Sequence, residues 1–141
     1  MLPLLWQVRR IKKETYDTYT LELESRAKPS PGPFLPGQFN MLYVHGIGEV
    51  PISISGDPGE RSGLVHTVRA VGAVSKAIAK MRPGDYLGVR GPYGTSWPVD
   101  EAEGMDIMVV AGGIGLAPLR PAIYSLLRER KRYGKLVLHY G

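Results

Sequence analysis

The sequence contains no cysteine, and this absence limits the chemistry that the chain can carry by itself. Disulfide bonds and an iron–sulfur cluster ligated by cysteine thiolates are both excluded. Three histidines occur, His45, His66 and His139, and their spacing matches no metal-ligand motif. We therefore expect no metal site, and we expect any redox centre that the chain binds to be an organic cofactor.

The sequence also lacks a long hydrophobic run. Residues 1–6 are apolar, but this stretch is too short for the hydrophobic part of a signal peptide before Arg9 and Arg10. No other segment has the length of a membrane span. These features predict a cytoplasmic protein without a membrane-spanning segment.

No strong excess of one charge is present either. The net charge of +5 is spread along the chain, and its densest cluster is Arg128, Arg130, Lys131 and Arg132, just before Gly134. Cations here complement the dipole of an ending helix, with the glycine as its cap, and no interleaved aromatic residues suggest a nucleic-acid groove. We interpret the cluster as a solvated helix end and expect no nucleic-acid partner.

Short strand patterns separated by turn residues fill the chain from residue 6 to residue 90. The clearest is residues 18–24, where Tyr19, Leu21 and Leu23 alternate with polar side chains, as in a half-buried strand. A stiff proline-rich loop is expected at residues 28–33. Strands are expected at residues 7–13, 18–24, 39–44, 51–55, 64–71 and 86–90, with a short helix at about 74–81. This spacing predicts a closed or nearly closed antiparallel barrel.

A different pattern follows, in which an apolar strand at residues 107–111 runs into Gly112, Gly113 and Gly115. A helix from Pro118 to about Tyr133 and a strand at residues 136–140 complete one βαβ unit. Glycines permit positive φ and close approach of a ligand, and a helix N-terminus attracts phosphate. The pattern by itself leaves phosphate binding and simple packing open, because Pro118 replaces the third glycine of the dinucleotide fingerprint.

Two parallel strands are too few to bury a sheet that is covered on both faces. Three explanations are consistent with a chain that stops at Gly141: a fragment of a longer protein, an oligomer or partner that completes the sheet, or a unit that docks on the barrel. We favour the fragment. The expected domains are residues 1–100 and an incomplete second domain at residues 101–141, joined at the acidic stretch 100–104.

Four motifs occur along the chain. They are Val-Pro-Ile-Ser-Ile-Ser at residues 50–55, His-Thr-Val-Arg-Ala-Val-Gly-Ala-Val-Ser at residues 66–75, Gly-Pro-Tyr-Gly at residues 91–94, and Gly-Gly-Ile-Gly-Leu-Ala-Pro at residues 112–118. Their sequences and their order resemble those of the ferredoxin–NADP reductase superfamily. The third is expected to form the turn between the barrel and the nucleotide domain. The chain most resembles the FAD-binding electron-transfer subunits similar to those of dihydroorotate dehydrogenase and to hydrogenase or sulfhydrogenase gamma subunits. Val50 and Ile52 stand where the broader superfamily has arginine and tyrosine.

This resemblance implies an FAD-binding Greek-key β-barrel followed by the first βαβ unit of an NAD(P)-binding α/β domain. It implies that Ser53 acts at the reactive edge of the flavin, which makes Ser53 the catalytic candidate. The residues implied in FAD binding are Pro51, Ile52, Ser53, Thr67, Arg69, Gly72, Ala73, Val74 and Ser75. Those implied in binding the pyrophosphate of NAD(P)H are Gly112, Gly113, Gly115 and Pro118.

Simpler roles remain open for several of these residues. Ser53 and Arg69 also fit an ordinary strand serine and an exposed strand arginine. Asn40 and Thr67 fit either contacts to the flavin or solvated strand positions. Three aromatic residues, Tyr43, Tyr93 and Trp97, are candidates for stacking on a cofactor or for packing.

The resemblance implies a flavin-dependent oxidoreductase component. Hydride would pass from NAD(P)H to FAD, and electrons would then pass to an iron–sulfur protein or to the catalytic subunit of a larger redox complex. The chain itself would hold no cluster. The alternative is a noncatalytic flavin-binding or structural subunit that has lost nicotinamide exchange.

Overall fold

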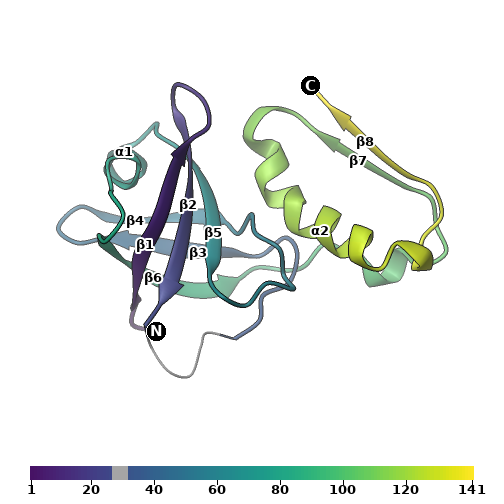
Figure 1. The fold of residues 1–141 in the computed structure, drawn as a ribbon, viewed down its shortest axis with the longest axis horizontal. Helices are drawn as coiled ribbons and strands as arrows, with labels where there is room; N and C mark the ends of the chain where they lie inside the picture. The colour runs from purple at the N-terminus through teal and green to yellow at the C-terminus, as the bar shows by residue number, and fades with distance from the viewer. Residues whose placement is uncertain (27–31) are drawn as a thin grey trace.

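The computed structural model describes residues 1–26 and 32–141, so most of the loop expected at residues 28–33 lies outside the described residues. Figure 1 shows two parts, a barrel-like sheet with a short helix and a smaller α/β part. None of the helices in these two ranges is both long and apolar enough to cross a membrane.

Six antiparallel strands and one helix form the first part. They are β1 (Leu4–Lys13), β2 (Thr18–Ser25), β3 (Phe39–Val44), β4 (Gly48–Ser53), β5 (Leu64–Arg69), α1 (Ala73–Ala79) and β6 (Tyr86–Tyr93). The strand order is β4-β3-β6-β1-β2-β5. The sheet is not closed by a full ladder, because the backbone contacts between the β4 side and β5 are a bridge between Ile54 and His66 and the bond from Ser55 N to Val65 O (2.9 Å). The expected fold class is confirmed as a nearly closed barrel.

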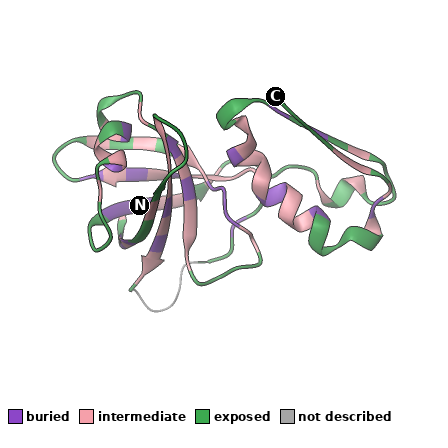
Figure 2. Ribbon diagram, turned by 45° about the horizontal axis from the view of Figure 1, so that its top comes forward, coloured by how far each residue is buried: buried purple, intermediate pink, exposed green. Residues whose placement is uncertain are grey.

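The core of this part comes from the inward positions of the strands. In β2 the alternating pattern buries Leu21 and Leu23, and in β3 it buries Leu42 and Val44. Figure 2 shows such buried positions along the barrel strands. Ile78 of α1 is fully buried in the same cluster, so the helix packs on the sheet through its apolar face.

The second part contains one parallel strand pair. Its elements are η1 (Asp100–Ala102), β7 (Ile107–Ala111), η2 (Gly113–Gly115), α2 (Leu116–Arg128), η3 (Arg130–Arg132) and β8 (Leu136–Tyr140). Val109, Leu126 and Tyr133 form its core, whereas Met108 and Val110 point away and are 66% and 67% exposed. The expected βαβ unit is therefore confirmed, with α2 on one face of the β7–β8 pair.

Strand β6 continues through Gly91 and Pro92 to Tyr93, where the sequence had suggested a turn. The extra residue is absorbed by a register shift opposite Phe39 and Met41 in β3, which makes this point a β-bulge. Gly91 has a φ of +142°, and a Cβ atom there would overlap Asn40 Oδ1. Only glycine therefore fits at this position.

We predict that Gly91→Ala lowers the free energy of unfolding by about 2 kcal/mol, because the methyl group meets Asn40 and the backbone conformation disfavours alanine. Chemical denaturation measures the change. Gly32→Ala is the matched control, since a Cβ atom at Gly32 meets nothing within 4 Å, and it should have little effect. Equal stability of the two variants would contradict the prediction.

Candidate functional site

A cleft of about 610 Å³ lies where the barrel meets the start of α2. One wall is the turn between β1 and β2 together with β5, and the other is the turn before α2, the first helical turns and the end of β8 (Figure 1). Its lining residues are Glu14, Thr15, Tyr16, Asp17, Thr18, Thr20, Thr67, Arg69, Gly113, Ile114, Leu116, Ala117, Arg120 and Tyr140. The volume is within the range of cofactor and small-molecule sites.

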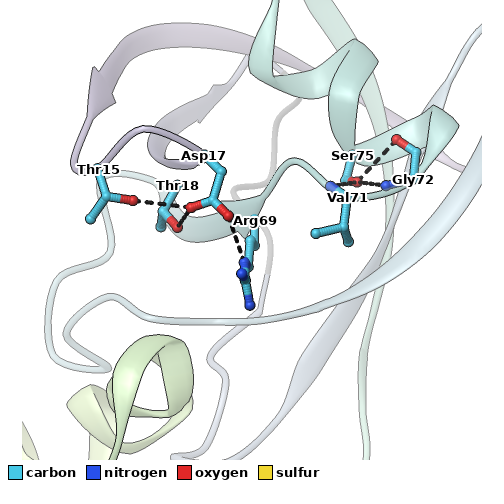
Figure 3. A network of polar contacts seen from close by, with 7 residues as sticks. All are labelled: Thr15, Asp17, Thr18, Arg69, Val71, Gly72 and Ser75. Atoms are coloured by element: carbon cyan, nitrogen blue, oxygen red, sulfur yellow. Dashed lines mark hydrogen bonds and ion pairs between the residues drawn. The ribbon is translucent and has the colours of Figure 1, made fainter. Parts of the chain in front are cut away.

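Asp17 organises the barrel wall of the cleft. Its carboxylate accepts hydrogen bonds from the hydroxyls of Thr15 and Thr18, both at 3.1 Å, and from Arg69 Nε at 2.7 Å (Figure 3). The hydrogen bond from Arg69 is the largest cause of the lowered pKa of Asp17. The turn and the end of β5 are thus joined by one ion pair at the mouth of the cleft.

A row of hydroxyls runs from the cleft into the barrel. Thr67 Oγ1 lies 3.1 Å from both Thr20 Oγ1 and Ser55 Oγ. Thr67 is half-buried and lines the cleft, so its hydroxyl is held between β2 and the segment after β4. This arrangement keeps one polar edge of β5 facing the cleft.

His66 lies behind this row and is fully buried. Its Nδ1 is 3.0 Å from the carbonyl oxygen of Ser53, and its Nε2 is 3.2 Å from Asn40 Nδ2. A carbonyl can only accept, so Nδ1 carries the proton and Nε2 accepts from the amide of Asn40. Burial lowers the pKa of His66 from 6.5 to about 4, although the hydrogen bonds to backbone carbonyls act in the opposite direction.

Pro51, Ile52 and Ser53 lie at the end of the edge strand β4, beside this histidine. Ser53 is half-buried, and its Oγ has no hydrogen-bond partner among the described residues, whereas its carbonyl binds His66. None of the three is among the residues that line the cleft. The backbone of Ser53 is therefore held by His66, and its hydroxyl has no hydrogen-bond partner among the described residues.

Ser75, which the resemblance implies in FAD binding, has its hydroxyl hydrogen-bonded to the loop before α1. Ser75 Oγ accepts hydrogen bonds from the N–H groups of Val71 (3.1 Å) and Gly72 (2.9 Å) and lies 3.2 Å from Gly72 O (Figure 3). The hydroxyl thus closes the loop before α1. The amides of Ala73 and Val74 open the helix, where N–H groups have no carbonyl one turn earlier.

The glycine turn before α2 holds one left-handed residue. Gly113 has a φ of +51°, whereas Gly112 and Gly115 have φ values of −130° and −59° that any residue can adopt. The N–H of Gly113 donates to Gly141 O (3.1 Å), and its carbonyl accepts from the hydroxyl of Tyr140 (3.0 Å). Positive φ is thus needed once, at Gly113. A Cβ atom at Gly115 would meet nothing within 4 Å, whereas one at Gly112 would contact Gly141 O at 3.6 Å.

Of the residues implied by the resemblance, Thr67, Arg69 and Gly113 come together around the cleft. Sequence reasoning missed the charged and aromatic side chains of the cleft, which are Glu14, Tyr16 and Asp17 on the barrel wall and Arg120 and Tyr140 on the other wall. The turn residues between the first two strand patterns and the arginine two positions after Pro118 were visible in the sequence. Only the fold shows that they face one another.

None of the three aromatic candidates lines the cleft. Tyr43 packs edge-on against His45, with ring centroids 6.4 Å apart, and Tyr93 packs against Phe39 at 5.8 Å. Trp97 Nε1 donates to the carbonyl of Pro118 at 3.3 Å, so this side chain links the two parts of the molecule. In the described residues, no group of three His, Asp or Glu side chains has a geometry that would hold a metal ion.

Comparison with known proteins identifies the relatives of this chain. No family model matches it. It is 39% identical over 123 residues to the gamma subunit of sulfhydrogenase 1 from Pyrococcus furiosus, covering 87% of this chain and 42% of that protein. It is 42% identical over 86 residues to the probable dihydroorotate dehydrogenase B (NAD(+)) electron transfer subunit from Methanocella arvoryzae, covering 61% of this chain and 30% of that protein. The chain is a homologue of these subunits.

Solved structures show that this chain has the fold of the ferredoxin–NADP reductase superfamily. Phthalate dioxygenase reductase, whose structure is described as modular for electron transfer from pyridine nucleotides to [2Fe-2S], matches 98% of the chain with a TM-score of 0.82 and 24% identity, over 43% of its own length. Ferredoxin-NADP+ reductase from Plasmodium falciparum matches 99% of the chain with a TM-score of 0.78 and 17% identity, over 58% of its own length. The chain spans less than half the length of the sulfhydrogenase gamma subunit and of the dihydroorotate dehydrogenase electron transfer subunit named above.

We predict that His66 makes the free energy of unfolding of this protein depend on pH. Unfolding restores the pKa of 6.5, so the unfolded state binds the extra proton in the interval between pH 6.5 and about pH 4. The contribution of the neutral histidine is complete above pH 6.5 and is lost as the pH falls toward 4. Between about pH 7 and about pH 5 the loss is about 2 kcal/mol.

Urea denaturation at the two pH values measures this loss, with His66→Gln as the comparison. The variant is less stable throughout, but its free energy of unfolding should change less between the two pH values. An identical pH dependence in both proteins would show that His66 does not remain neutral in the barrel.

Proposed function

We propose that this chain forms the flavin-binding part of an oxidoreductase component that passes electrons from NAD(P)H, through FAD, to an iron–sulfur protein or to the catalytic subunit of a larger redox complex. The observation that carries the proposal is the cleft between the barrel and α2, on which Thr67, Arg69 and Gly113 converge in a homologue of electron-transfer subunits. We further propose residues 1–100 as the flavin unit and residues 101–141 as the beginning of the NAD(P) unit.

The described residues fit an FAD cofactor in two respects. Thr67 and Arg69 present a hydroxyl and a cation to the cleft along β5. The hydroxyl would form a hydrogen bond that the cofactor otherwise makes with water, and the cation would neutralise a phosphate. The loop before α1 is built for close approach, because a Cβ atom at Gly72 would meet only Ser75 Oγ, at 3.8 Å. Arg69 would supply the positive charge that Val50 lacks.

Each proposed residue has a defined task. Asp17 holds Arg69 through Nε, and Tyr16 is a second side-chain hydrogen-bond partner of Arg69. The remaining N–H groups of the guanidinium would donate to a phosphate. Ser53 would donate its uncommitted hydroxyl to the cofactor edge, and the amides of Ala73 and Val74 would hold the pyrophosphate. When bound, FAD supplies hydride acceptance and release of single electrons.

The composition of the chain bears on where the iron–sulfur cluster lies. Because the 141 residues contain no cysteine, we place the iron–sulfur cluster outside them. Gly112, Gly113, Gly115 and Pro118 would receive the pyrophosphate of NAD(P)H, with Gly113 and Gly115 offering open space above the backbone.

We predict that the purified chain, incubated with FAD and then desalted, retains a visible flavin absorption band. Addition of NADH or NADPH in the absence of oxygen should bleach the band if the nicotinamide site is competent. A retained band that neither nucleotide bleaches would favour the noncatalytic flavin-binding subunit. A flat spectrum would refute the flavin site and favour a structural subunit.

A reciprocal pair of variants tests whether the two cofactors have separate sites. Gly115→Val should abolish NAD(P)H binding and leave FAD bound, whereas Gly72→Val should weaken FAD and spare NAD(P)H. Both positions have φ values that valine accepts, −59° and −120°, and neither has a close steric neighbour. Isothermal titration with each nucleotide measures the effect, and equal loss of both ligands in either variant would contradict two separate sites.

A further inference from the structure

Four charged side chains line the cleft, and three of them have a partner of opposite charge. Glu14 is paired with Lys12, whose Nζ lies 3.0 Å from Oε2, and Asp17 is paired with Arg69 at 2.7 Å. Arg120, on the α2 wall, makes no ion pair with any of the described residues. The cleft therefore contains one cation without a counter-ion.

Arg120 is held in place by its own helix. Its Nη2 donates to the hydroxyl of Tyr124 at 2.7 Å, and its guanidinium lies 5.5 Å from the centre of the Tyr124 ring. Residues four apart lie on the same face of a helix, so Tyr124 both supports and orients the guanidinium. The hydrogen bond occupies one of five N–H donors and leaves the rest for another acceptor.

The charge of Arg120 acts across the cleft. The pKa of Glu14 is lowered mainly by its hydrogen bond with Lys12, and Arg120 adds a smaller contribution from the opposite wall. Arg69 also faces the cleft, so a ligand between the walls meets one arginine on each side. Gly113, Leu116 and Ala117 lie on the same wall as Arg120, and the positive end of the α2 dipole adds to its charge.

We propose that Arg120, oriented by Tyr124, is a phosphate-binding residue of the cleft and takes a phosphate group of a nucleotide cofactor. The inference rests on the proposed function and names a ligand contact within that site. A planar guanidinium with several free donors matches two oxygens of a phosphate at once, which a lysine cannot do. The phosphate belongs either to FAD or to the pyridine nucleotide, since both carry the same chemistry.

The test is nucleotide binding by the whole chain, measured by isothermal titration with FAD, NADH and NADPH separately. Arg120→Gln should weaken binding of the ligand that supplies the phosphate by roughly 10- to 100-fold. The affinity of this variant for the nucleotide should also depend less on salt concentration, because one phosphate contact is lost. Arg82→Gln is the matched control: it removes the same charge from an exposed arginine outside the cleft and should change neither quantity.

Two further variants separate ligand binding from a structural role. Tyr124→Phe keeps the charge of Arg120 but removes the hydroxyl that orients it, so we expect a loss of less than about tenfold in affinity. Arg120→Lys keeps the positive charge but lacks the planar guanidinium with its several N–H donors. Its affinity should therefore lie between those of Arg120→Gln and the unaltered chain. Thermal unfolding of all variants checks that they remain folded.

The outcomes distinguish the source of the phosphate. Weakened FAD binding alone assigns Arg120 to the flavin dinucleotide, and weakened pyridine-nucleotide binding alone assigns it to that ligand. Unchanged affinities in a folded Arg120→Gln protein would overturn this inference and leave the proposed function intact. Failure of the unaltered chain to bind any of the three nucleotides would instead overturn both.

Discussion

The hydrogen bonds of His66 connect the two free edges of the barrel sheet. The ring donates to the carbonyl of Ser53 at the end of β4 and accepts from Asn40 on β3, while its own backbone belongs to β5. Among the described residues the buried side-chain nitrogen of Asn40 has no other hydrogen-bond partner, and leaving such a group unpaired costs more than an ordinary hydrogen bond gains. The neutral imidazole therefore joins β3 and β4 to β5 where the barrel closes, beside the Ile54–His66 bridge and the bond from Ser55 N to Val65 O.

The barrel wall of the cleft depends on the pairing of β5 with β2. This ladder places Thr67 opposite Thr20 and Arg69 opposite Thr18, beside the β1–β2 turn, and Asp17 completes that wall with an ion pair. The opposite wall is brought near by bonds at the two ends of α2. Trp97 donates to the carbonyl of Pro118, and Arg128 pairs with Asp57 in the segment after β4.

Predictions from local sequence patterns were wrong where the role of a residue depends on a contact with a segment that is distant in the chain. Gly134 follows the basic cluster and suggested a helix cap, but α2 ends at Arg128. A side chain at Gly134 would overlap Asp106, which accepts from the N–H of Lys135 at 2.6 Å. The arginines of the cluster likewise find partners: Arg132 pairs with Asp100, Glu103 and Glu129, so the acidic stretch packs against the end of the helix.

The sequence by itself determined the kinds of elements and their order, because these depend on local periodicity and on glycine and proline chemistry. The alternation in residues 18–24 and the apolar strand before Gly112 needed no tertiary information. The resemblance of four motifs to one superfamily likewise indicated the barrel followed by the βαβ unit. Tertiary structure decided which polar groups meet: Ser75 closes its own loop, His66 joins two strands, and Arg120 faces the hairpin turn. Such pairings depend on the register and packing of segments far apart in the chain, which no local pattern records.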